Sequence, residues 1–167
     1  SVFVRDIKQA KQYVLIGKHQ EAVLKKILPG EYTVVLPSKG KVCKELESEN
    51  KSLGIRIPDN ALISDVTEKF NRPITATSAN ISGASPHYSI ESFLHSLSEK
   101  KKKMIDVVVD AGKIPRRKPS TVLDFTSDTL SILRQGDEHH VHDAHDAYVT
   151  HIDYKKKGTT YITKSAK

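Results

Sequence analysis

The chain has 167 residues, of which 37% are hydrophobic, so it is long enough to bury a core and fits one globular domain. Its formal net charge of +7 favours anionic partners such as a nucleotide or RNA. The single cysteine, Cys43, excludes a framework of internal disulfides and fits a reducing compartment, so we expect a cytoplasmic location. No apolar run reaches the length that crosses a membrane.

The first 70 residues alternate between short apolar runs and helical patterns. Strands are predicted at residues 1–4, 32–36 and 53–58. Helices are predicted after Asp6, at about residues 20–28, around residues 44–47, and from the N-cap Asn60 to Phe70.

The same alternation continues in the second half of the chain. A short β-type run at residues 74–77 leads into a polar loop, and Ser89 is a candidate N-cap for one amphipathic helix that ends in the lysines of residues 100–103. Further strands are predicted at residues 104–109, 119–124 and 130–134. Strands alternating with helices predict an α/β fold with a twisted mixed β-sheet flanked by helices.

Residues 72–86, RPITATSANISGASP, are rich in small hydroxyl and amide side chains. Such residues cannot build a core, but their side chains and backbone N–H groups can surround an anion such as phosphate. An ordinary strand-to-helix connection, rich in residues that favour turns, has the same composition. The loop alone therefore leaves both interpretations open.

Three polar residues lie at strands or strand ends elsewhere in the chain. Arg56 falls inside an apolar strand, where a guanidinium is costly unless it pairs with a carboxylate or phosphate. Ser120 precedes a β-branched strand, and Arg134 ends the last predicted strand. This set suits a carboxylate together with a polyphosphate. The alternatives are a structural ion pair for Arg56 and a solvated strand end for Arg134.

Six segments in a fixed order resemble the threonylcarbamoyl-adenylate synthase family, the YrdC-like domain, over residues 1–136. The segments are PGEYTVVLP (29–37), GIRIPDN (54–60), TSANISG (77–83), VVDAG (108–112), PSTVLD (119–124) and ILRQG (132–136). The resemblance implies an α/β fold with a concave ligand-binding face. It also implies a nucleotidyltransferase that forms threonylcarbamoyl-AMP and pyrophosphate from L-threonine, bicarbonate and ATP, for the threonylcarbamoyl modification of adenosine in tRNA.

The resemblance also assigns site residues. Those that match the threonine-binding positions are Arg56, Ala76 and Ser120. Those that match the ATP-binding positions are Ser52, Ser78, Asn80, Ser85 and Arg134. No side chain is expected to act as a covalent nucleophile, so catalysis would consist of positioning and charge stabilisation, with Mg²⁺ on the triphosphate and no permanent cofactor. A downstream tRNA threonylcarbamoyl transferase is the implied partner.

Two departures from the family pattern shape what we expect of this chain. The family has further strands, a threonine-rich turn and a basic motif ahead of the segment that begins here, so we expect a domain at residues 1–136 that lacks its N-terminal part and forms little product alone. Residues 137–167, rich first in His and Asp and then in Lys, are expected to be a C-terminal extension.

Two other function classes stay open. One is an RNA-binding module without turnover, which would use the basic residues 100–103, 116–118 and 155–157. The other is a metal-binding protein that would use the histidines of residues 139–151. We expect no metal site of this kind, because the ligands are crowded and no second shell is apparent.

Overall fold

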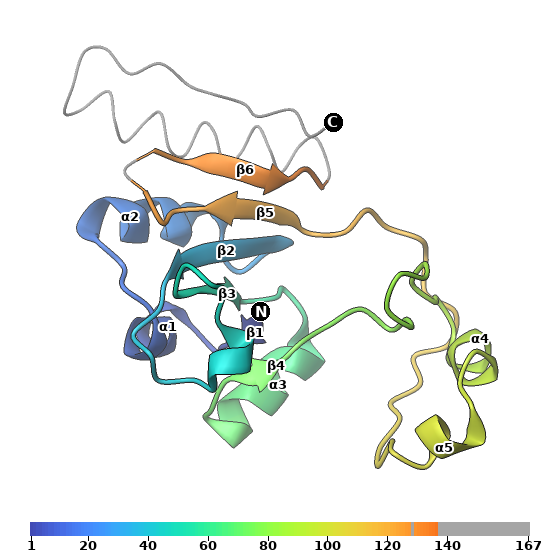
Figure 1. Cartoon of the computed structure of the whole chain (residues 1–167). Helices are drawn as coiled ribbons and strands as arrows, with labels where there is room; N and C mark the ends of the chain where they lie inside the picture. Colours follow the sequence, from blue (N-terminus) through green and yellow to red (C-terminus); the bar gives the residue numbers. More distant parts are fainter. Residues whose placement is uncertain (128, 137–167) are drawn as a thin grey trace. The chain divides into compact units, whose positions relative to one another are not determined.

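The computed structural model describes residues 1–127 and 129–136, which form two compact units (Figure 1). The sheet unit comprises Ser1–Ala76 and the described part of Pro119–Lys167, and the loop unit is Thr77–Lys118. The predicted C-terminal extension, its histidines and its lysines lie outside the described residues. In the described part of the chain, no helix is long and apolar enough to cross a membrane.

Six strands form one mixed sheet in the order β4-β1-β3-β2-β5-β6 (Figure 1). Their bounds are Val2–Phe3 (β1), Tyr32–Pro37 (β2), Ser52–Arg56 (β3), Ile74–Thr75 (β4), Thr121–Asp124 (β5) and Ser131–Arg134 (β6). Strand β1 pairs with β3, and β2 with β5, in parallel, while the other neighbours are antiparallel. The predicted mixed α/β sheet is confirmed, although β4 is two residues shorter than expected and β3 ends at Arg56 rather than Pro58.

Three helices of the sheet unit form where the sequence predicts them: Ile7–Tyr13 (α1), Lys18–Ile27 (α2) and Ala61–Phe70 (α3), with a 3₁₀ turn at Lys44–Leu46 (η1). The caps are those expected, because Asp6 Oδ1 accepts a hydrogen bond from the Gln9 backbone N–H at 2.6 Å and Asn60 Oδ1 accepts one from Ile63 at 3.1 Å.

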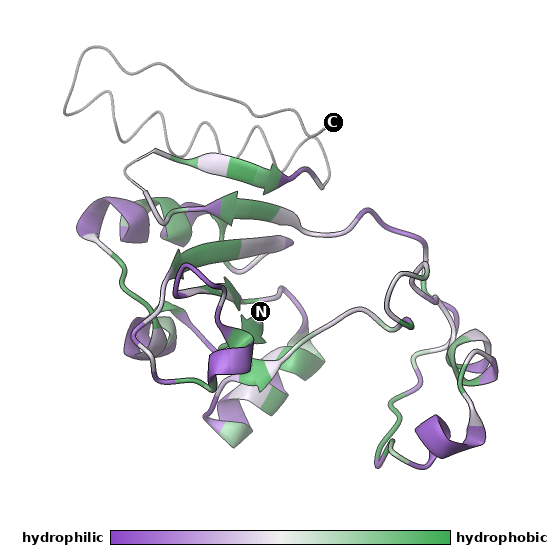
Figure 2. Cartoon of the chain, viewed as in Figure 1, coloured by the Kyte–Doolittle hydropathy of each residue, from purple (hydrophilic) through white to green (hydrophobic). Residues whose placement is uncertain are grey.

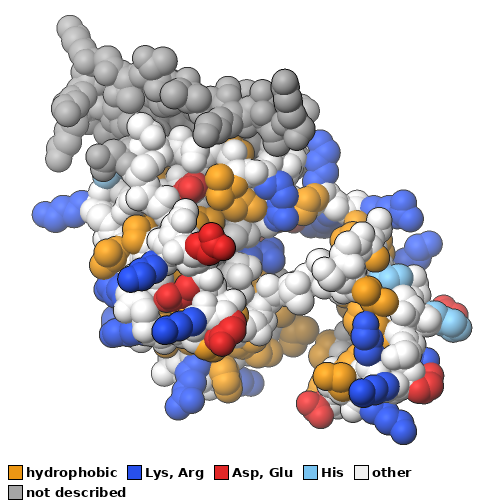
Figure 3. Space-filling model, in the orientation of Figure 1, with side chains coloured by type: hydrophobic (Ala, Val, Ile, Leu, Met, Phe, Trp, Pro, Cys, Tyr) orange, Lys and Arg blue, Asp and Glu red, His pale blue; other side chains and the backbone are white. Residues whose placement is uncertain are grey.

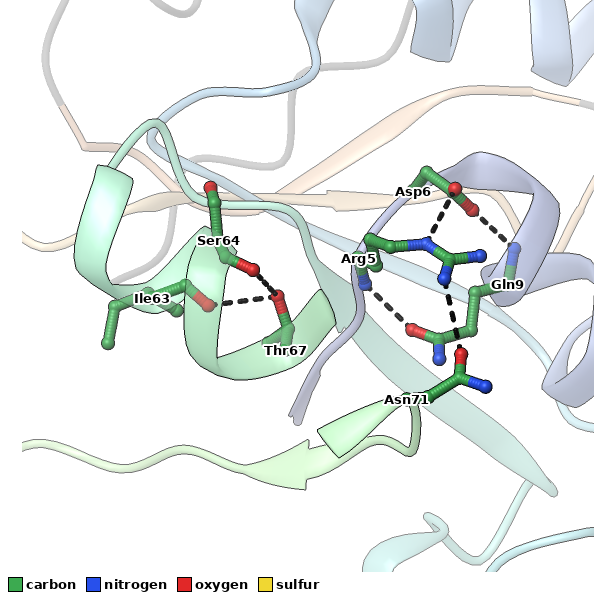
Figure 4. Close-up of polar contacts among 7 residues, drawn as sticks. All are labelled: Arg5, Asp6, Gln9, Ile63, Ser64, Thr67 and Asn71. Carbon is green, nitrogen blue, oxygen red and sulfur yellow. Dashed lines mark hydrogen bonds and ion pairs between the residues drawn. The ribbon is translucent and has the colours of Figure 1, made fainter. Parts of the chain in front are cut away.

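Arg5 joins the start of α1 to the end of α3 (Figure 4). Its Nε donates to Asp6 Oδ2 at 3.0 Å, and its Nη1 donates to Asn71 Oδ1 at 3.2 Å. Asn71 closes α3 in the left-handed conformation, with φ of 53°. The arginine therefore ties together two helices that are distant in the sequence.

The core lies on one face of the sheet, because side chains alternate across a strand and one set is buried. The strands are largely hydrophobic (Figure 2). Their buried residues form a single cluster with residues of α1 and α2. From the strands and their ends come Val2, Val4, Tyr32, Val34, Leu36, Leu53, Ile55, Ile57, Leu123 and Phe125, and from the helices and their ends come Ala10, Val14, Val23, Leu24, Ile27 and Leu28. The alternate strand residues Phe3, Val35 and Val122 are only half-buried. We call this second surface the open face.

The loop unit differs from the prediction in two ways. Residues 104–109, predicted to be a buried strand, form no regular structure, and Val107 is 77% exposed. The single predicted helix is two short ones, Ile90–His95 (α4) and Glu99–Lys102 (α5), neither of which buries a residue. An apolar run becomes a strand only when a neighbouring strand pairs with it, and sequence pattern alone cannot supply that neighbour.

Candidate functional site

The predicted site residues of the sheet unit lie on its open face or at the ends of its strands. Because Val34 pairs with Ile55, Thr33 lies opposite Arg56. Both belong to the alternate residues of the open face, where Thr33 is buried and Arg56 is half-buried. Strands β5 and β6 continue this face with Val122 paired to Arg134. The packed face therefore stabilises the sheet, while the open face presents polar side chains.

Arg56 ends β3, and its side chain is half-buried. Its guanidinium lies 5.0 Å from the centroid of the Phe3 ring, on the neighbouring strand. Its Nε is buried and makes no hydrogen bond, and no ion pair or hydrogen bond joins its guanidinium to the described part of the chain. A cationic donor in this state suits an anionic ligand.

Arg134 and Ser120 form the second part of the site. The Nε and Nη2 groups of Arg134 donate to the Ser120 carbonyl at 3.0 and 2.8 Å, and Nη2 also lies 3.0 Å from Ser120 Oγ. Ser120 Oγ lies 3.0 Å from Thr33 Oγ1. Three strands, β2, β5 and β6, thus contribute to one hydrogen-bonded cluster.

The charges of the two arginines act on each other. Burial lowers the pKa of Arg56, the positive charge of Arg134 lowers it further, and the negative charge of Glu31 partly offsets both effects. Arg56 stays protonated at neutral pH because an arginine pKa starts far above 7. The open face therefore has an excess of positive charge at the ends of β3 and β6.

Two other predicted residues, Ser52 and Ala76, lie away from the cluster of Arg134, Ser120 and Thr33. Ser52 begins β3, so it lies four residues from Arg56, or about 13 Å along a strand. It is buried, and its Oγ lies 2.7 Å from Ser48 Oγ. Ala76 continues the β1–β4 pairing, since its backbone N–H donates to the Ser1 carbonyl at 3.3 Å. The structure therefore brings together Arg56, Ser120 and Arg134, but not Ser52.

The remaining predicted residues, Ser78, Asn80 and Ser85, lie in the loop unit. Asn80 organises its loop: Oδ1 accepts a hydrogen bond from Ser78 Oγ, and Nδ2 donates to the carbonyls of Ile81 and Ala84 at 3.0 and 2.9 Å. Ser78 and Ser85 are exposed. The Asn80 side chain thus uses both of its N–H donors to shape the loop, while the serines lie on its surface.

A family profile described as "Telomere recombination", that of Sua5, YciO and YrdC, matches residues 1–136. This chain belongs to that family. It is 32% identical to human threonylcarbamoyl-AMP synthase over 123 residues, covering 70% of this chain and 42% of the human protein.

Two solved structures of the family share the fold. Escherichia coli YciO superposes with a TM-score of 0.71 at 26% identity, covering 81% of this chain and 64% of YciO. P. abyssi Sua5 complexed with L-threonine also superposes at 0.71, with 27% identity, covering 81% of this chain and 39% of Sua5. The chain spans 61 to 65% of the length of the curated relatives that match it first. The family and the mixed-sheet fold expected from the sequence motifs are both confirmed.

Three residues near the site were not predicted: Phe3, Glu31 and Thr33. Phe3 and Thr33 lie in apolar or β-branched runs that were assigned to the core, and Glu31 precedes such a run. Only the strand register places them beside Arg56 and Ser120. The hydroxyl of Thr33 within an otherwise apolar strand was the one signal that could have identified it.

Proposed function

We propose that this chain provides the L-threonine site and part of the ATP site of an L-threonylcarbamoyladenylate synthase. The reaction would join L-threonine, bicarbonate and ATP to form threonylcarbamoyl-AMP and release pyrophosphate and water. The observation that carries this proposal is the Arg56 guanidinium, half-buried on the open face and without a hydrogen bond to the described residues. The relatives named as threonylcarbamoyl-AMP synthases support the proposal.

In this proposal Arg56 binds the carboxylate of L-threonine, with Ser120 beside it and the backbone of Ala76 as a further contact. A planar guanidinium can form two parallel hydrogen bonds to one carboxylate, which fixes the orientation of the amino acid. Fixing the threonine amine and the bicarbonate relative to each other would lower the barrier to carbamate formation, without any covalent enzyme intermediate.

Arg134 and Ser52 are proposed as ATP contacts of the sheet unit, and Ser78, Asn80 and Ser85 as those of the loop unit. Mg²⁺ would enter bound to the triphosphate, because substrate phosphates commonly supply several of its ligands. Cationic donors near the phosphates would stabilise the charge that develops on pyrophosphate as it leaves.

The same proposal includes three wider assignments. They are a cytoplasmic location, supply of the product to a tRNA threonylcarbamoyl transferase, and contact with tRNA. The loop unit carries eight basic and four acidic side chains, a formal net charge of +4. On the face shown in Figure 3, however, Lys and Arg side chains are spread over the molecule rather than gathered in one patch. The named synthases likewise do not favour an RNA-binding module without turnover.

Isothermal titration calorimetry with this 167-residue chain tests the proposal. We expect L-threonine to bind, and Arg56→Met to reduce its affinity much more than the surface substitution Arg72→Met. Turnover is measured as pyrophosphate released only when threonine, bicarbonate and ATP are all present. A chain that does not bind L-threonine would contradict the proposed function.

A further inference from the structure

Thr33 is a buried polar residue on the open face. It is not among the residues proposed above to bind L-threonine or ATP. It lies within β2, is 8% exposed, and is surrounded by strands on both sides. Its methyl group packs over Gly54, where an added Cβ would lie 3.2 Å from Thr33 Cγ2. A β-branched side chain has few χ1 rotamers, so this packing fixes the hydroxyl in one place.

The Thr33 hydroxyl has one hydrogen-bond partner within the described part of the chain, Ser120 Oγ at 3.0 Å. If Ser120 donated to Thr33, the Thr33 proton would be buried without an acceptor, which is costly. If Thr33 donates to Ser120, its proton is satisfied. The second arrangement is therefore favoured.

Ser120 Oγ carries one proton and can accept two hydrogen bonds. Arg134 Nη2, which can only donate, lies 3.0 Å from this oxygen. With Thr33 as the second donor, both acceptor positions are filled. The proton of Ser120 is then left to point at a ligand, and Ser120 becomes a donor rather than an acceptor.

We propose that Thr33 is a positioning residue that, together with Arg134, fixes the Ser120 hydroxyl as a hydrogen-bond donor, so that the open face selects a carboxylate over a neutral group. Thr33 lies opposite Arg56 in the strand register and 3.0 Å from Ser120 Oγ, so Arg56 and Ser120 lie on the two sides of Thr33. Two donor groups match the two oxygens of a carboxylate. This inference rests on the proposed threonine site.

The test compares L-threonine with L-threoninol, which has an alcohol in place of the carboxylate, by calorimetry on the full chain. Thr33→Val keeps the shape and removes the hydroxyl, and we expect it to weaken L-threonine binding about fivefold to tenfold, the effect of one hydrogen bond. The affinity for L-threoninol and for ATP should change less than twofold. Thr33→Ser, which restores the hydroxyl, should bind L-threonine within about twofold of the parent chain.

A double variant separates positioning from general damage. In a Ser120→Ala background, Thr33→Val should have no further effect on L-threonine affinity, because the hydroxyl that it orients is gone. Equal losses for L-threonine and L-threoninol, failure of Thr33→Ser to restore binding, or additive effects in the double variant would each overturn the inference. If the parent chain binds no L-threonine, the proposed function fails; if it binds L-threonine and Thr33→Val binds it equally well, only the role of Thr33 fails.

Discussion

The two units of the chain contain similar sequence patterns but use them differently. In the sheet unit, residues 121–124 form β5 between β2 and β6, and Leu123 is completely buried. In the loop unit, residues 104–109, which are more apolar, form no strand, and no residue of Thr77–Lys118 is buried. The difference shows that neighbouring strands, rather than local β-propensity, decide which apolar run becomes part of a core.

The largest difference in stability should appear when one apolar side chain in each unit is truncated to alanine. Ile55→Ala in β3, where Ile55 is 1% exposed, should lower the free energy of unfolding by about 2–5 kcal/mol, because it removes buried methyl groups and leaves a cavity. Val108→Ala, at a position that is 46% exposed, should change it by less than about 0.5 kcal/mol. Urea denaturation measures both. A comparable loss for Val108→Ala would show that the loop unit has a core in solution.

A change on the open face should affect binding rather than folding. Arg56→Met removes a charged donor and keeps an unbranched apolar side chain, so L-threonine affinity should fall about tenfold to a hundredfold. The free energy of unfolding should stay the same or rise, because the substitution removes a buried donor that has no hydrogen-bond partner among the described residues. Calorimetry and urea denaturation measure the two quantities. Destabilisation of more than about 1 kcal/mol without loss of binding would assign Arg56 to the fold alone.

A smaller effect is expected at the cap of α1. Burial tends to raise the pKa of Asp6, but the Gln9 backbone N–H and the charges of Arg5 and Lys8 outweigh it and lower the pKa below its ordinary value of 3.8. The ionised cap therefore stabilises the fold above this ordinary value, and the contribution is lost as the pH falls through the lower pKa of the folded state.

Asp6→Ala should lower the free energy of unfolding by about 0.5–1 kcal/mol at pH 7. This is at the low end of the range for an N-cap, because the Asp6 side chain is 45% exposed. The cost should disappear at a pH well below 3.8. Asp65→Ala, within α3 and away from its cap, is the control and should have little effect at either pH. An effect of Asp6→Ala that does not depend on pH would contradict the capping role.

The smallest effect on global stability is expected in the loop unit. Asn80→Ala removes the hydrogen bonds to the Ile81 and Ala84 carbonyls, so backbone amides of residues 80–87 should exchange with solvent faster. The unfolding midpoint should hardly move, because this unit buries no side chains. Hydrogen exchange followed by mass spectrometry measures the local effect, with Ser85→Ala as the control. A global loss of more than about 1 kcal/mol would mean that this loop supports the whole fold.

Much of the fold could be predicted because the relevant signals are local. Asp6 and Asn60 cap α1 and α3 as expected, since a short polar side chain ahead of an apolar periodic run has few other roles. The prediction of a strand at residues 104–109 was wrong because the pairing that would make one is not a local property. Among the site residues, Arg56 could be identified because an arginine in an apolar strand is costly, whereas Thr33 resembled its β-branched neighbours.

The sequence by itself determined the six ordered motifs, the strands of the sheet unit and its helix caps, because these depend on side-chain chemistry over a few residues. Only the tertiary structure decided which face of the sheet is packed and which is open, since that depends on where α1 and α2 lie relative to the strands. It also decided that Arg56, Ser120 and Arg134 meet near Thr33, because residues such as Thr33 and Ser120, 87 positions apart along the chain, come together only through the register of β2, β3, β5 and β6.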